Sequence, residues 1–388
     1  MRKTLLFSAI SACILTVQAE TAEIRVYNPG NIERNGELVE VDESSVKRRL
    51  GSPFFILRDA SGEEVPWQKT HDGKIIFPVK IAPLDSALYI AEPGMPSVVE
   101  PRVYGRLFRE RADDMTWEND RAAYRAYGPG QQRNGDRTFG YDLWTKSVPE
   151  LVLEKRYIMN NRKGLTFHRD HGNGMDVYAV GPTLGGGTAA LLDADGSIIY
   201  PWCFSDYEIL EQGPLRFQVR LIYPVGTAEK GLPVAEERVV TLDAGDWLNR
   251  TEVMYYGLTD KCPVVAGQVV HKQNPDAYVL DTENGFAAYA DLTEDANAGN
   301  GVIFAGMVAE SDAKPLYLPL DKPAGDAVGH VVLRGEVENN RPFVYHWGAG
   351  WSKGGMPTMD EWKEVLRHKR ECVKNPMRVK VTDGVKVK

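Results

Sequence analysis

The residues best suited to chemistry are concentrated in one short stretch, 167–178, which holds two of the seven histidines and a glycine-rich turn. Histidine transfers protons near neutral pH because its ordinary pKa lies there, and glycines let the backbone approach a ligand closely. We therefore predict a general acid/base site. The same residue types leave two alternatives: a hydrogen-bonded surface loop, or a divalent-metal site on His168, Asp170 and His171. The candidates for proton transfer here are His168, His171 and Tyr178, with Asp176 placed to orient His171.

A second group lies in the segment Trp117–Gly128, which is expected to form one strand. The two-residue period of a strand places Asn119, Arg121 and Arg125 on one face. Two guanidinium groups and an amide on one face can bind a carboxylate, because arginine offers a planar pair of donors. The alternative interpretation is the solvated face of an exposed strand.

The next strand-like segment, Gly140–Lys146, places Asp142, Trp144 and Lys146 on one face. An aromatic ring flanked by charged and hydrogen-bonding groups can hold a sugar ring. An ordinary amphipathic strand with Trp144 in the core explains the same pattern equally well.

Two more histidines are expected where strands meet loops, a position at which binding residues gather. His271 ends one expected strand, and His346 stands beside Trp347 in another. We include His271, His346 and Trp347 as candidates, although a single histidine at such a position more often has a structural role.

The elements that must position these residues are mostly strands. The runs 23–27, 53–57 and 74–79 are separated by turn residues, and Asp72-Gly73 is a hairpin signal. Longer alternating runs follow at 215–223 and 237–242. With 37 Gly and 23 Pro, the chain favours antiparallel β structure over an α/β fold.

The expected organisation is a small N-terminal β-sandwich domain, residues 20–97, followed by a large antiparallel β-sandwich, residues 98–388. One helix is predicted near the C-terminus, where Thr358 and Glu361 form a capping box. Residues 1–19 have the pattern of a secretion signal, which predicts a periplasmic or secreted protein. Attachment as a lipoprotein through Cys13 is the alternative.

The composition of the 388 residues excludes some classes of function. Asp and Glu number 54 against 46 Lys and Arg, a formal net charge of -8, and no dense basic run is present. Nucleic acid is therefore not an expected partner. The chain carries no phosphate-binding glycine motif and no GxSxG motif, and its sequence calls for no cofactor. No transmembrane segment is expected either.

Several strings in combination resemble a bacterial family known as domain of unknown function 4861. The resemblance implies a galactose-mutarotase-like β-sandwich, exported by bacteria that digest polysaccharides. It also implies, for some members, a dehydratase that forms a 4,5-unsaturated uronic acid at the non-reducing end of an oligosaccharide. The strings that carry it are Trp117–Asp120, Arg125, Tyr127-Gly128, Tyr141–Lys146, Asp170–Tyr178, Gly181–Gly185 and Gly213–Arg216.

Such an elimination on an acidic oligosaccharide needs a cation for the substrate carboxylate, a base for the C5 proton and an acid for the departing hydroxyl. We expect Arg125, with Asn119 and Arg121, to bind the carboxylate. The base is then His171 or Tyr178, the acid is His271 or His168, and Trp144 and Trp347 stack on sugar. Two alternatives stay open: a hydrolase or mutarotase that uses Asp142 and Asp176, or a non-catalytic sugar-binding protein.

Overall fold

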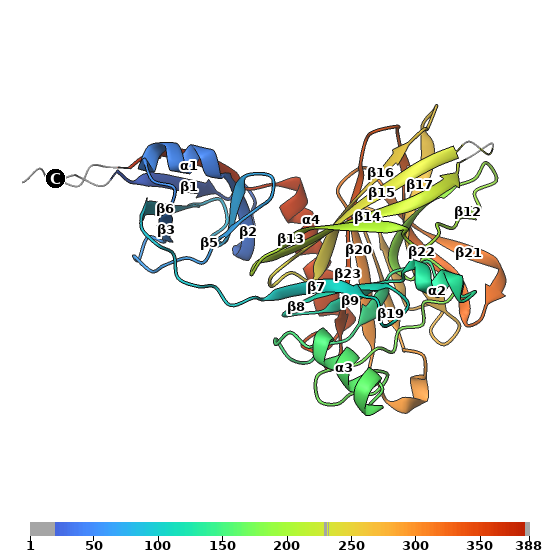
Figure 1. The fold of residues 1–388 in the computed structure, drawn as a ribbon. Helices are drawn as coiled ribbons and strands as arrows, with labels where there is room; N and C mark the ends of the chain where they lie inside the picture. Colours follow the sequence, from blue (N-terminus) through green and yellow to red (C-terminus); the bar gives the residue numbers. More distant parts are fainter. Residues whose placement is uncertain (1–19, 229–230, 232, 385–388) are drawn as a thin grey trace, which may run out of the picture.

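A computed structural model describes residues 20–228, 231 and 233–384, so the predicted signal at 1–19 lies outside the described residues. The fold is mostly β, as predicted, with sandwich-like packing of antiparallel sheets. Figure 1 shows a small unit beside a larger one. In the described part of the chain, no helix is long and apolar enough to cross a bilayer.

The small unit packs two sheets and one helix around its own core. Its sheets have the strand orders β24-β1-β6-β3 and β2-β5-β4. Its elements are β1 (Ala22–Tyr27), β2 (Arg34–Asp42), α1 (Glu43–Leu50), β3 (Phe55–Arg58), β4 (Gln68–Lys69), β5 (Lys74–Ile81), β6 (Ser86–Pro93) and β24 (Arg378–Asp383).

The last strand of the chain, β24, returns to this small unit instead of staying with the large one. It pairs with β1 in the register Ile24↔Val381. The alternation of residues 378–382 explains the position, because Val379 and Val381 pack on the small core while Arg378 and Lys380 point outward. The small unit is therefore built from both ends of the described chain.

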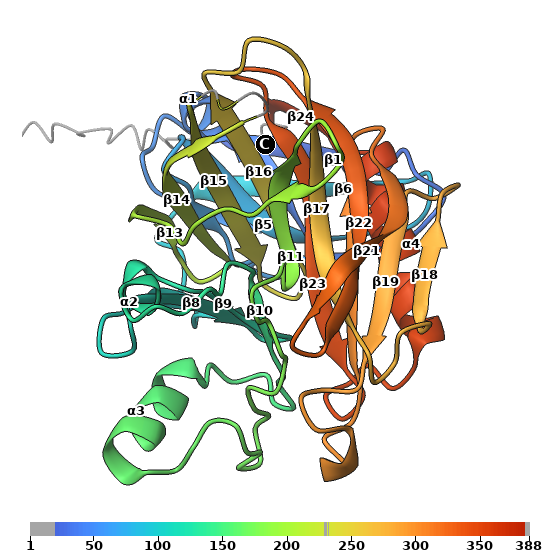
Figure 2. The same cartoon turned by 90° about the vertical axis from the view of Figure 1, so that its right-hand side faces the viewer.

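The large unit is dominated by a five-stranded and an eight-stranded sheet, whose facing side chains form one core. The five-stranded sheet has the order β12-β11-β17-β22-β21, and Figure 2 views this side of the molecule. Its strands are β11 (Gly186–Leu192), β12 (Ile198–Ile199), β17 (Cys262–His271), β21 (Lys314–Ala324) and β22 (Ala327–Val337).

The eight-stranded sheet has the order β13-β14-β15-β16-β23-β20-β19-β18. Along β14, Phe217, Val219 and Leu221 are buried and their neighbours in sequence point to the opposite face. The sheet consists of β13 (Asp206–Gln212), β14 (Arg216–Thr227), β15 (Pro233–Asp243), β16 (Leu248–Tyr256), β18 (Tyr278–Asp281), β19 (Phe286–Asp291), β20 (Ile303–Ala309) and β23 (Phe343–Trp351).

The predicted C-terminal helix is confirmed as α4 (Met359–Lys374). Thr358 Oγ1 accepts the Glu361 N–H at 3.2 Å, as the capping box requires. Trp362 and Leu366 bury one side of α4 against β19 and β20. The apolar stripe of the helix therefore covers part of the outer face of the eight-stranded sheet.

A third layer of the large unit has the strand order β10-β9-β8-β7 and carries two helices that the sequence did not reveal. Figure 2 shows α3 and its loops below this sheet. The elements are β7 (Val103–Phe108), β8 (Asp114–Asn119), β9 (Ala123–Ala126), β10 (Asp142–Trp144), α2 (Pro129–Arg133) and α3 (Leu153–Lys163); a 3-10 helix, η2 (Ala296–Ala298), lies further along the chain.

Candidate functional site

The Arg125 guanidinium, predicted to bind a substrate carboxylate, is buried among acidic side chains of the protein. Its Nη2 donates to Asp142 Oδ2 at 2.5 Å and to Asp176 Oδ2 at 3.0 Å. A third carboxylate, that of Asp114, is 3.7 Å from Nη1. Because these groups already neutralise Arg125, a substrate carboxylate needs another cation.

Asp142 and Asp176, the alternative hydrolytic pair, are buried together in this cluster.

The buried cluster holds protons that exposed carboxylates would have lost. Burial raises the pKa of Asp114 to about 6, although the positive charge of Arg125 opposes the shift. Burial also raises the pKa of Asp176 well above its ordinary value. Three carboxylates around one guanidinium thus form a structural cluster that depends on pH.

The prediction of one continuous strand over Trp117–Gly128 is wrong, because the chain turns back between β8 and β9. Asn119 causes the turn: its Oδ1 accepts the N–H groups of Arg121 and Ala122 at 2.8 and 3.0 Å. Its side-chain amide is also occupied, since Nδ2 donates to main-chain oxygens of Asp243 and Asp246. Arg121 is therefore exposed at a hairpin tip, far from the environment of Arg125.

Trp144 and Lys146 are packed inside the protein, so neither presents an open face for a sugar. The indole of Trp144 donates to Asp142 Oδ2 at 2.9 Å and stacks on Tyr157. Lys146 Nζ donates to Glu118 Oε2 at 2.7 Å. This segment is therefore an ordinary strand with Trp144 in the core, which was the second of the two alternatives.

The stretch 167–178 is mostly a loop, and its two histidines do not converge. His168 Nδ1 lies 2.8 Å from the main-chain oxygen of Asp176, and His171 Nε2 lies 2.9 Å from that of Thr166. Asp170 Oδ1 instead accepts N–H groups of the glycine-rich turn. Among the described residues, no three His, Cys, Asp or Glu side chains are grouped as metal ligands, and His168, Asp170 and His171 form no such group.

Tyr178 and His271 do lie together, with ring centroids 6.1 Å apart, but both are held by the protein. The Tyr178 hydroxyl donates to Gly185 O at 3.0 Å. His271 contacts Asp291 Oδ2 through Nδ1 at 2.6 Å and Ala179 O through Nε2 at 2.9 Å. Burial alone would lower the pKa of His271, but the bond to Asp291 outweighs it and raises the pKa. Both ring nitrogens face protein acceptors, which leaves neither open to a substrate.

His346 lies in the middle of β23, so the prediction that it ends a strand is wrong. Its Nε2 lies 2.9 Å from Glu310 Oε1, and burial lowers its pKa. Trp347, the next residue, points to the opposite side of the sheet and is fully buried, with one face stacked on Tyr141 at 4.5 Å. Trp347 is therefore a core residue, whereas His346 lines a cavity on the outer face.

That cavity belongs to a groove between the small unit and the outer face of the eight-stranded sheet. One part has a volume of 540 Å³ and is bounded by β2, the 243–248 loop and α4. The adjoining part has a volume of 440 Å³ and lies below the β4–β5 turn. Thr241 and Arg250 line both parts, so the two parts adjoin. We call it the interdomain groove.

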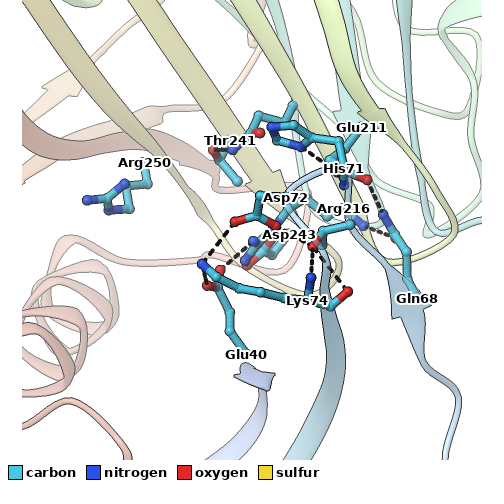
Figure 3. A network of polar contacts seen from close by, with 12 residues as sticks. Glu40, Gln68, His71, Asp72, Lys74, Glu211, Arg216, Thr241, Asp243 and Arg250 are labelled. Carbon is cyan, nitrogen blue, oxygen red and sulfur yellow. Dashed lines mark hydrogen bonds and ion pairs between the residues drawn. The ribbon is translucent and has the colours of Figure 1, made fainter. Parts of the chain in front are cut away.

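A histidine–carboxylate pair joins the two units across this groove (Figure 3). His71 Nδ1 lies 2.7 Å from Glu211 Oε1, which also accepts the His71 main-chain N–H. Glu211 is buried, whereas the His71 side chain is 45% exposed. Because the carboxylate fixes the ring through Nδ1, Nε2 is the nitrogen that remains to exchange a proton with a ligand.

Local structure places His71 at this position. It stands at the tip of the hairpin between β4 and β5, the turn that Asp72-Gly73 predicted. Gln68, from β4, extends its side chain into the large unit, where Oε1 accepts the N–H groups of Leu215 and Arg216 at 2.9 Å. A Cβ on Gly213 would come within 2.1 Å of Gln68 Cδ, so the end of the Gln68 side chain would have to leave this position.

Two arginines of the large unit that line the groove differ in whether a carboxylate neutralises them. Arg250 pairs with Glu310 at 2.7 Å and with Glu252, and Figure 3 shows it across the groove from the His71 hairpin. In the described part of the chain, the Arg121 guanidinium has neither an ion pair nor a hydrogen bond; it lies over the Trp247 ring, 5.4 Å from the centroid. Arg121 is thus the cation most available to an acidic ligand.

Of the residues that line the groove, Arg121 and His346 were expected from the sequence, whereas four others were not: His71, Glu211, Trp247 and Arg250. The turn signal marked the hairpin that carries His71, yet that hairpin lies in the small domain, for which no site was expected. Its partner is 140 residues away in sequence. No local pattern relates the two residues.

The comparisons with known proteins place the chain in a family. A family model described as "Domain of unknown function (DUF4861)" matches residues 26–379. The chain belongs to this family. It is 26% identical over 380 residues to "Uncharacterized protein P7" of Formosa agariphila, covering 92% of this chain and 93% of that protein.

Two solved structures from Enterococcus faecalis are also similar. One is described as an alpha-mannosidase: TM-score 0.49, 8% identity, 95% of this chain and 46% of that one. The other is described as a protein in the Glycosyl Hydrolase Family 38: TM-score 0.49, 10% identity, 96% of this chain and 48% of that one. The chain spans about half the length of both structures.

Proposed function

We propose that the protein is a carbon–oxygen lyase that removes water from a uronic acid at the non-reducing end of an oligosaccharide, with the interdomain groove as its active site. The observation that carries the proposal is the His71–Glu211 pair, in which the carboxylate holds the ring at Nδ1 while the His71 side chain is 45% exposed. The family resemblance supports the reaction, and the predicted signal at residues 1–19 fits an exported enzyme.

The reaction needs charge compensation before the C5 proton can leave. Arg121 lies in the same groove without a carboxylate partner, and Arg250 lines both of its parts. A guanidinium that binds the substrate carboxylate stabilises the negative charge that develops when C5 loses its proton. We assign this role to Arg121 in place of Arg125; Arg250, which is paired with Glu252 and Glu310, borders the same groove.

His71 then transfers the proton. Its Nε2 accepts the C5 proton, the electron pair of that C–H bond forms the C4–C5 double bond, and the C4–O bond breaks. The imidazolium, held by Glu211, returns the proton to the departing hydroxyl, so that water leaves and the ring is neutral again. One histidine thereby replaces the separate base and acid expected from the sequence.

The test uses oligosaccharides capped with glucuronate or galacturonate, and ultraviolet absorbance that only an unsaturated uronate has. The proposal predicts rising absorbance with no new reducing end. Release of reducing sugar without absorbance would instead support a hydrolase, and binding without any conversion would support a sugar-binding protein; both outcomes contradict the proposal.

A further inference from the structure

A second cavity lies at the far end of the large unit, where β12 and the β14–β15 hairpin come together (Figure 1). Its volume is 230 Å³, below that of most drug-sized ligand sites but suited to a single small ring. It shares no lining residue with either part of the interdomain groove. Its lining includes Tyr200, Trp202, Tyr223, Val225, Glu236 and Tyr255.

The rim of this cavity is aromatic and open to solvent. Trp202 is 49% exposed, and Val225 beside it is 65% exposed. Phe139 supports the rim from behind, stacking on Tyr200 at 5.7 Å and meeting Trp202 edge-on at 6.3 Å. An indole held in this way offers a rigid apolar face at the mouth of a pocket.

The floor, by contrast, is polar. The Tyr255 hydroxyl is buried and has no hydrogen-bond partner among the described residues. Glu236 Oε1 accepts from Arg238 Nε at 2.5 Å, and Arg238 itself lies beneath the Tyr223 ring at 4.2 Å. A buried hydroxyl without a partner is costly, which indicates a ligand or solvent group that completes it.

We propose that this cavity binds one neutral pyranose ring of an oligosaccharide, at a site separate from the interdomain groove. A pyranose has an apolar face that suits Trp202 and hydroxyl groups that suit Tyr255 and Glu236. The lining includes one carboxylate and no cation, so a uronic acid is disfavoured. The inference concerns binding alone and does not depend on the elimination reaction.

The test measures binding of neutral hexasaccharides of glucose, xylose, mannose and galactose by titration calorimetry. We expect at least one to bind, with affinity lowered at least tenfold by Trp202→Ala and by Tyr255→Phe. Phe54→Ala is the matched control, because Phe54 is an exposed aromatic (57%) in the small unit, and it should leave affinity unchanged. Tyr255→Phe removes a hydroxyl without a partner in the protein and should keep the melting temperature.

Two results would overturn this inference: no binding of any of the four sugars to the wild-type protein, or binding that both substitutions leave intact. Arg121→Ala separates this site from the active site. It should weaken conversion of the uronate-capped substrate while neutral-sugar affinity stays unchanged. A protein without lyase activity that still binds through Trp202 would contradict the proposed function only.

Discussion

Glu211, at the end of β13 in the large unit, holds the imidazole of His71, which stands at a hairpin tip of the small unit, with 2.7 Å between Oε1 and Nδ1. The candidate active site therefore exists only when the two units are docked. Removing either side chain tests whether this contact serves catalysis.

We expect His71→Ala to lower turnover of a uronate-capped oligosaccharide by about a hundredfold or more, because it removes the proton-transfer group. The side chain is half-exposed, so the melting temperature should change little. Added imidazole should restore part of the activity. Wild-type turnover in the variant would exclude His71 from catalysis.

Arg121→Lys is expected to raise KM for the acidic substrate about tenfold, because lysine keeps the charge but loses the planar pair of donors. The exposed guanidinium contributes little to stability, so the fold should be retained. Initial rates at several substrate concentrations provide the measurement. An unchanged KM together with a reduced kcat would contradict a binding role.

Gly213→Ala tests the docking of the units, since its Cβ would lie 2.1 Å from Gln68. A displaced Gln68 side chain loses its hydrogen bonds to Leu215 and Arg216, which anchor the strand that leads to His71. We therefore expect kcat to fall although residue 213 contacts no substrate. Gly226→Ala is the matched control, because a Cβ there meets no atom within 4 Å. Equal activity of the two variants would show that the contact does not position His71.

How far the sequence predicts this structure depends on the separation of the residues involved. The α4 capping box and the alternation along β14 act between neighbours, and both were predicted correctly. The return of β24 to the small unit and the His71–Glu211 contact depend on pairing between distant segments. Neither has a local signature.

The distance between residues along the sequence also explains why the candidate site could not be predicted as a whole. Residue types suited to chemistry drew attention to Arg125 and Lys146, but ion pairs with distant carboxylates bury both. Burial and pairing, which decide whether a charged group can meet a ligand, are properties of the folded chain. Arg121 was expected on one face of a strand with Arg125, but it stands in the turn between β8 and β9, and its role in binding stays a prediction.

Asp114→Asn should stabilise the protein at neutral pH, because three carboxylates share Arg125 and burial raises the pKa of Asp114 to about 6. The ordinary pKa of Asp114 is 3.8. Between this pH and about pH 6, the folded state still holds a proton on Asp114 that the unfolded chain has released. Asp114 therefore lowers stability as pH rises through this range. In urea unfolding from pH 4 to 8, the free energy of unfolding should decline less in the variant than in the wild type. An identical decline would contradict a raised pKa at Asp114.

Asp291→Asn should cost about 3–5 kcal/mol, because it leaves the buried His271 without its carboxylate. The pKa of His271 is raised above 6.5 in the folded state. The stability that the charged His271 gives the fold is therefore fully present below pH 6.5, and it is lost as the pH rises through the pKa of the folded state. Denaturant unfolding at pH 6 and pH 9 measures both effects. A variant that loses the same stability at both pH values would show that His271 is not charged.

The most direct test of the central claim is a crystal structure of His71→Ala with an intact uronate-capped trisaccharide. We expect the sugar in the interdomain groove, with its carboxylate on Arg121 and with C5 facing the space that the imidazole occupied. His168 and Asp170 line another cavity, of 460 Å³, and a uronate bound there with the groove empty would contradict the proposal.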